Sequence, residues 1–218
     1  MQQSSVPPVA TRIEWRPWLA IALLSTGLAV VSLLSDLQSE ALLSRSVPDQ
    51  LAVARWVLSQ LLNSGVLWAG AQLLAGAVMA RPLRGALAAV LTGEASLVLH
   101  YALGRLLGTM PVGVWEENAH WFVIAVIAGV PLGAMGALWR RQGLSGLVAR
   151  LLVPVGAIVE PFLRHWLSSR PEVVDHSTPS LVAERISGWT LLVLGAIGII
   201  VAVASWRRRA RKQLPSNA

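Results

Sequence analysis

Residues 119–141, AHWFVIAVIAGVPLGAMGALWRR, consist of a long apolar run that ends in a pair of arginines. Within this stretch, no Asp, Glu, Lys or Arg occurs before Arg140. A helix rises about 1.5 Å per residue, so about 20 apolar residues cross the hydrocarbon core of a bilayer. The stretch therefore predicts a transmembrane helix whose basic end lies at the membrane surface.

Five other stretches have the same character, at 18–37, 54–80, 85–107, 144–167 and 186–206. The chain has 218 residues, of which 55% are hydrophobic and 13% charged, and this composition is too apolar for an ordinary soluble domain. We therefore predict an all-α polytopic membrane protein. It has a bundle of six transmembrane helices within residues 12–206, a disordered N-terminus at 1–11 and a basic tail at 207–218.

Charged residues are sorted between alternate ends of these stretches. Eleven of the 18 basic residues form four groups separated by pairs of apolar stretches: Arg12 and Arg16, Arg81 and Arg84, Arg140 and Arg141, and Arg207, Arg208, Arg209, Arg211 and Lys212. The opposite ends carry Asp36, Glu40, Asp49, Glu116, Glu117, Glu172, Asp175 and Glu184. Because basic loops stay in the cytoplasm, this sorting predicts cytoplasmic termini and a multi-pass protein of the bacterial inner membrane.

The composition also limits partners and chemistry. The net charge of +7 lies in short loops and the tail, so anionic lipid headgroups, rather than nucleic acid, are the expected counter-charge. The chain has no cysteine, which excludes disulfides and thiolate chemistry. It also lacks the GxSxG, GxxxxGK[ST] and HExxH motifs and the dinucleotide glycine pattern, so we expect neither an enzyme nor a cofactor.

Small residues recur every four positions in the quoted stretch, at Ala125, Gly129, Gly133 and Ala137. This spacing places them on one face of a helix, where another backbone can approach closely. Packing within the bundle is the expected use of this face. The alternatives are a homodimer interface and a docking face for another subunit.

Several ionisable or polar residues fall inside the predicted spans. Glu94 lies near the middle of its span, where a charge costs about 2.5–3.5 kcal/mol on insertion scales, so it must be protonated, paired or hydrated. Tyr101 follows on the same helical face. The others are His100, Arg150 and Glu160, together with Asn63 and Gln72 on opposite faces of one predicted helix.

These residues allow two main interpretations. They form either a satisfied network between helices or the wall of a polar cavity that binds a cation, a proton or a small polar solute. We take Glu94, His100, Tyr101, Arg150 and Glu160 as candidate binding residues. Catalysis and metal binding by His100, Glu94 and Glu160 are less favoured, because no metal-binding spacing occurs.

Several positions within residues 60–165 form a recognisable pattern: Trp68, Arg84-Gly85, Gly129-Val130-Pro131-Leu132-Gly133 with Gly136, Arg140-Arg141 and Glu160. In these positions the stretch resembles an uncharacterised family of six-helix membrane proteins common in actinobacteria, a domain of unknown function. The resemblance implies a fold and a membrane location, and no catalytic residue. The size and topology are also similar to those of the six-helix substrate-binding subunits of vitamin transporters.

The sequence therefore predicts a protein that binds or moves a small solute through an intramembrane cavity. The alternative is a noncatalytic membrane subunit that stabilises or recruits a partner membrane protein.

Overall fold

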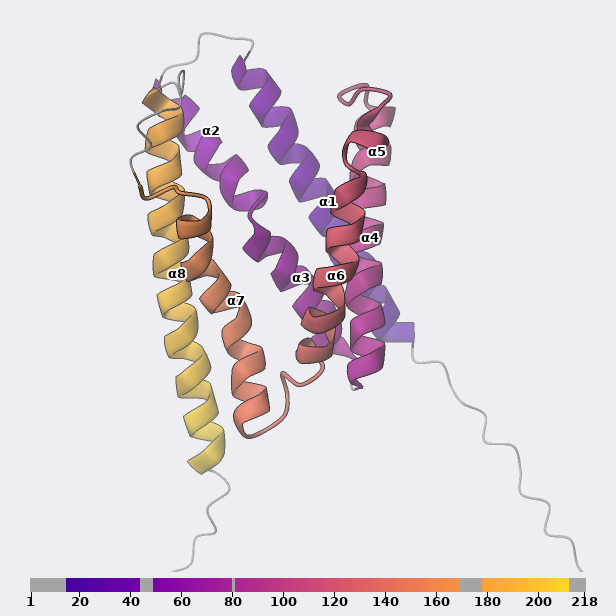
Figure 1. The fold of residues 1–218 in the computed structure, drawn as a ribbon, viewed down its shortest axis with the longest axis vertical. Coiled ribbons are helices and arrows are strands. Elements are labelled where there is room, and N and C mark those ends of the chain that lie inside the picture. Colours follow the sequence, from indigo (N-terminus) through magenta and orange to yellow (C-terminus); the bar gives the residue numbers. More distant parts are fainter. Residues whose placement is uncertain (1–14, 44–48, 80, 169–177, 212–218) are drawn as a thin grey trace, which may run out of the picture.

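A computed structural model describes residues 15–43, 49–79, 81–168 and 178–211, which form eight helices and no strand (Figure 1). The helices are α1 (Trp15–Leu43), α2 (Asp49–Leu62), α3 (Gly65–Val78), α4 (Pro82–Leu106), α5 (Val114–Glu117), α6 (Ala119–Gly136), α7 (Leu144–Leu163) and α8 (Thr178–Arg211). The predictions for residues 1–11 and 212–218 lie outside the described residues. Residues 207–211, predicted as tail, continue α8.

Six segments of the described chain are long and apolar enough to cross a membrane. They are Trp15–Asp36, Gln50–Val78, Pro82–Leu106, Ala119–Gly136, Leu144–Leu163 and Pro179–Arg209. Each overlaps one of the predicted spans. The prediction of an all-α, six-span bundle is confirmed, and the chain is a multi-pass membrane protein.

The second span is broken, which the sequence analysis did not predict. α2 ends at Leu62 and α3 begins at Gly65, while Ser64 between them has extended backbone angles, with φ −70° and ψ 143°. The Ser64 hydroxyl accepts a hydrogen bond from the Leu67 N–H at 3.2 Å. Ser is a favoured N-cap because its oxygen satisfies one of the free N–H groups at a helix start. The span therefore consists of two helices with a new helix start inside it.

The small face of α6 packs against helices of the same chain. A Cβ atom added to Gly133 would clash with the Gly85 carbonyl and with Ala89 on α4. One added to Gly136 would clash with the Leu73 carbonyl on α3. Ala125, Ala137 and Gly129 are also buried, and Gly129 lies against Val90 of α4. Backbone contacts to α4 and α3 therefore occupy this face.

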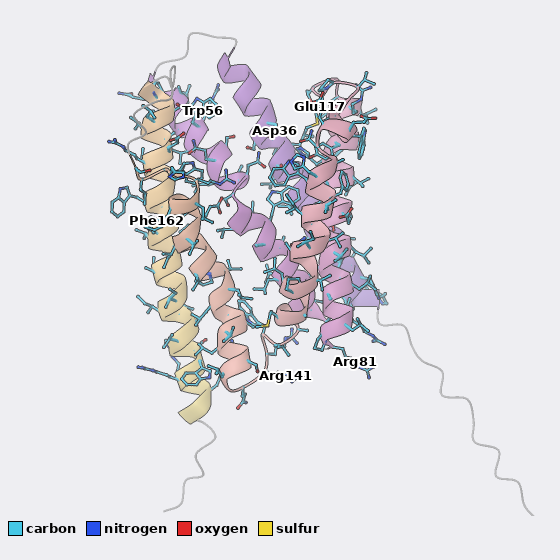
Figure 2. The ribbon with its side chains drawn as sticks, in the orientation of Figure 1. Asp36, Trp56, Arg81, Glu117, Arg141 and Phe162 are labelled. Carbon is cyan, nitrogen blue, oxygen red and sulfur yellow. The ribbon has the colours of Figure 1, made fainter. Side chains whose placement is uncertain are left out.

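The broken span connects two parts of the bundle. α2 packs against α8 and α1, whereas α3 packs against α6, α4 and α1, and α7 packs mainly against α8 (Figure 1). α1 begins and α8 ends at the same end of the bundle, and Figure 2 places Arg81 and Arg141 at that end. Glu117 lies at the opposite end, which we call the α5 end (Figure 2). The basic loops of the described chain thus share one end.

Candidate functional site

The N-terminus of α3 is capped by a carboxylate from α7. Glu160 Oε1 accepts a hydrogen bond from the Gly65 N–H and Oε2 accepts one from the Val66 N–H, both at 2.9 Å. Backbone N–H groups and the helix dipole make a helix N-terminus favourable for negative charge. Glu160 therefore satisfies the donors that the break in the second span exposes.

A second charge neutralises this carboxylate. Arg164 Nε lies 2.7 Å from Glu160 Oε1, one helical turn farther along the chain. Glu160 is buried, with 8% of its surface exposed, whereas the Arg164 side chain is 44% exposed. A buried charge is tolerated when it is paired and hydrogen-bonded. Glu160 meets both conditions, so it forms part of the scaffold that holds the break.

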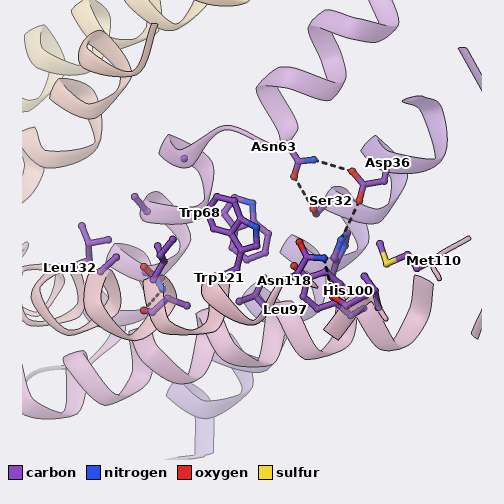
Figure 3. Close-up of a pocket in the computed structure, with 18 of the residues that line it drawn as sticks. Ser32, Asp36, Asn63, Trp68, Leu97, His100, Met110, Asn118, Trp121 and Leu132 are labelled. Carbon is purple, nitrogen blue, oxygen red and sulfur yellow. Dashed lines mark hydrogen bonds and ion pairs between the residues drawn. The ribbon is translucent and has the colours of Figure 1, made fainter. Parts of the chain in front are cut away.

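A cavity of about 570 Å³ lies beside the break, among α1, α3, α4, α5 and α6 (Figure 3). Drug-sized ligands occupy pockets of about 300–1,000 Å³, so the volume suits a small solute. The polar lining comprises Ser32, Asp36, Asn63, Gln72, His100, Asn118 and Arg164. The aromatic lining comprises Trp68, Tyr101 and Trp121.

A chain of polar contacts joins α1, the break and α4 on one wall of this cavity (Figure 3). Asp36 Oδ1 accepts a hydrogen bond from Asn63 Nδ2 at 3.0 Å, and Asp36 Oδ2 lies 3.2 Å from His100 Nε2. Ser32 Oγ donates to Asn63 Oδ1 at 2.9 Å. The Asp36 side chain is 40% exposed and that of His100 only 7%. The carboxylate is thus fixed in direction and still accessible.

Aromatic rings pack against one another at the α4 side of the cavity. The ring of Tyr101 meets Trp115 edge-on, with centroids 5.5 Å apart, and contacts Phe122 at 6.0 Å. Trp115 stacks on Phe122 at 6.2 Å. Such pairs favour a fixed ring geometry. The site therefore combines a hydrogen-bonded polar wall with the ring of Tyr101, which is packed against Trp115 and Phe122.

Gln72 and Asn63 both line the cavity, although the sequence placed them on opposite faces of one helix. The backbone between α2 and α3 is not helical, so the helical spacing does not extend across the break. Gln72 Nε2 donates to the Ala125 carbonyl of α6 at 3.1 Å. A side chain on Gly93 would collide with this amide, so Gly93 is the residue that admits Gln72 between the helices.

Glu94 lies apart from the cavity. It is half-buried on the same side of α4 as Leu87, Leu91 and Val98, all three of which are exposed. Its Oε1 atom is buried without a hydrogen-bond partner in the described part of the chain. The proposed network of Glu94 with Arg150 and Glu160 is therefore not what the structure forms.

Arg150 also lies away from the cavity, toward the end of the bundle opposite the α5 end. Its Nε and Nη2 atoms donate to the Trp139 carbonyl, at 3.1 and 2.9 Å. Trp139 follows the end of α6, where carbonyl groups lack helical partners. Only 4% of the surface of Arg150 is exposed. Arg150 therefore fixes the turn between α6 and α7.

Of the five candidate binding residues, His100 and Tyr101 line the cavity. Glu160 adjoins it through Gly65 and Arg164, both of which line it, whereas neither Glu94 nor Arg150 does. Sequence reasoning missed Asp36 as a site residue, because charge sorting counted it among the acids at the end of its predicted span, 18–37, whereas α1 continues to Leu43. No group of three or more His, Asp or Glu side chains able to hold a metal ion occurs in the described ranges.

The fold and the site together define a multi-pass membrane protein with a cavity beside a broken helix. Comparisons with protein-family profiles, with curated proteins and with solved structures find no match for the chain.

Proposed function

We propose that the protein binds a small solute in the cavity beside the α2–α3 break and acts as a noncatalytic binding or translocating protein of the bacterial inner membrane. The observation that carries the proposal is the Asp36–His100 pair on the wall of a cavity of about 570 Å³. Ionisable residues within membrane spans mark solute paths, and broken helices commonly lie at such sites.

The proposed topology has both termini in the cytoplasm, so that the cavity lies toward the external side. The clustering of Arg81, Arg141 and the end of α8 at one end of the bundle supports it (Figure 2). Arg207, Arg208 and Arg209 are exposed on α8 and suit anionic lipid headgroups at that surface. Membership of the actinobacterial six-helix family is also proposed, from the resemblance of residues 60–165. Two of the matching residues, Gly129 and Gly133, pack against α4.

Native mass spectrometry of the full chain, released from gentle detergent, tests solute binding. We expect a copurified small molecule on the wild-type protein that is absent from Ala128→Trp, because Ala128 lines the cavity and a larger side chain would fill it. Ile127→Trp is the matched control, since Ile127 is adjacent on α6 and 69% exposed. Ala69→Leu, on α3, repeats the test if Ala128→Trp does not fold. An adduct that survives both cavity-filling changes contradicts the proposal.

A noncatalytic subunit that binds a partner membrane protein is the second candidate. Glu94 favours it, because its half-buried side chain lies on the same side of α4 as the exposed apolar residues Leu91 and Val98. Polar side chains form hydrogen bonds between transmembrane helices, so a partner helix on this side could donate to the accessible part of the carboxyl group. The same spectra would then contain a bound protein, or a second copy of the chain, that Glu94→Gln loses.

A further inference from the structure

We propose that the cavity takes an organic cation with an apolar body, held by the carboxylate of Asp36 against aromatic rings. This inference rests on the proposed function and adds the chemical class of the solute. It depends on the charge balance of the cavity wall and on the chemistry of the rings that line it.

Asp36, His100 and Arg164 are the residues of the cavity lining, apart from the phenol of Tyr101, that can carry a charge. The charge of Arg164 is matched by Glu160, 2.7 Å away. Asp36 accepts from the uncharged amide of Asn63, and its other contact is His100. The net charge of the wall therefore depends on whether the imidazole of His100 carries one proton or two.

The geometry around His100 favours a proton on Nε2 over one on Nδ1. Its Nε2 atom faces Asp36, whereas its Nδ1 atom is buried without a partner among the described residues. A proton on Nδ1 would bury an N–H donor with no acceptor, which costs about 1–3 kcal/mol. An uncharged ring with its proton on Nε2 donates a hydrogen bond to Asp36. Only the acceptor at Nδ1 is then without a partner among the described residues. The carboxylate then keeps an unbalanced negative charge.

The rest of the wall suits the body of such a ligand. Trp68, Tyr101 and Trp121 line the cavity, together with Leu97 and Leu132. A cation within about 6 Å of an aromatic face is attracted by the ring, most strongly by Trp. Because the Asp36 side chain is 40% exposed, a ligand in the cavity can reach it. Opposite charge and aromatic faces thus favour the same class of solute, and an anion would be repelled.

Two probes of similar shape and opposite permanent charge test the inference on the purified full chain. Benzyltrimethylammonium is the cation and phenylmethanesulfonate the anion, and isothermal titration calorimetry measures their affinities. We expect saturable binding of the cation and none of the anion. Asp36→Asn should weaken cation binding roughly tenfold or more, because it removes the negative charge opposite the quaternary ammonium group, which carries no N–H and is held by charge alone. Trp121→Leu should weaken it by a smaller factor, about two- to fivefold.

The controls separate this inference from the proposed function. Glu116→Gln removes one acidic charge from α5, where Glu116 is exposed and outside the cavity lining, so it should leave the affinity unchanged. If Asp36→Asn does not fold, the affinities of the two probes for the wild-type chain and the effect of Trp121→Leu on cation binding still test the inference. Failure of the cation to bind at millimolar concentration, equal binding of the anion, or an unaltered affinity in folded Asp36→Asn overturns the inference. The proposed function would still stand if the copurified solute is lost from Ala128→Trp.

Discussion

The carboxylate of Glu160 accepts a hydrogen bond from the backbone N–H of Gly65, which lies 95 positions earlier in the chain, at 2.9 Å. The contact joins the end of α7 to the start of α3 within the membrane-spanning part of the bundle. No water is available in the bilayer core to satisfy exposed backbone groups, so a broken span needs protein groups at its break. Glu160 and Ser64 provide them, and the cavity forms beside this supported break.

Replacing Glu160 should therefore destabilise the fold. Glu160→Ala leaves the N–H groups of Gly65 and Val66 without their acceptors, and each buried unsatisfied donor costs about 1–3 kcal/mol. Glu160→Gln keeps one acceptor oxygen and should lose less. The melting temperature in detergent measures both changes. Glu116→Ala, at an exposed position, is the control. Equal melting temperatures for Glu160→Ala and the control would contradict the capping role.

The close approach of α6 to α4 leads to a second prediction. Gly133→Ala should lower the free energy of unfolding by about 1–3 kcal/mol, because the added methyl group meets the Gly85 carbonyl in a packed contact. Gly27→Ala on α1 is the matched control, since, apart from the adjoining turns of its own helix, no atom of the described residues lies within 4 Å of the added Cβ there. Alanine is the better helix former, so Gly27→Ala should be neutral or stabilising. Thermal unfolding of both variants in one detergent checks the difference, and similar losses would exclude a specific contact at Gly133.

The sequence predicted the membrane spans well because a span depends on local properties of the chain. An apolar run such as 119–139 must be long enough to cross the bilayer, and its flanking charges set where it ends. The break in the second span had a weaker local signal in Asn63-Ser64-Gly65, residue types that favour turns and helix starts. The mainly apolar stretches on both sides nevertheless made residues 54–80 resemble one continuous span.

The site was harder to predict because its contacts join distant residues. His100 and Tyr101 were identified as polar residues inside a span, but no spacing rule pairs His100 with Asp36, 64 positions before it in the chain. Glu94 illustrates the opposite error. Its central position suggested a paired or cavity-lining role, whereas the structure places it, half-buried, beside exposed apolar residues of α4 and outside the cavity lining. Depth in the membrane can be read from the sequence, but the side of a helix that faces the cavity depends on packing.

The proposed topology can be tested in this cysteine-free chain. Val112→Cys lies at a residue that is 77% exposed in the connection between α4 and α6, and it should react with an impermeant thiol reagent in intact cells. Gln142→Cys, exposed in the connection between α6 and α7, should react only after permeabilisation. Gel-shift labelling reads out both variants. The reverse pattern would place the termini outside, with the cavity toward the cytoplasm.

Glu94→Gln should behave in the opposite way to Glu160→Gln. The described residues offer Glu94 Oε1 no hydrogen-bond partner, and a charge near the centre of a span costs about 2.5–3.5 kcal/mol on insertion scales. Its removal should leave the melting temperature unchanged or raise it, whereas Glu160→Gln lowers it. The copurified solute should also be retained, because Glu94 does not line the cavity. Thermal unfolding and native mass spectrometry of the two glutamine variants, prepared side by side, measure both effects. A lower melting temperature together with loss of a bound protein would assign Glu94 to an interface and favour the subunit role. Loss of the solute alone would contradict the position of the binding site.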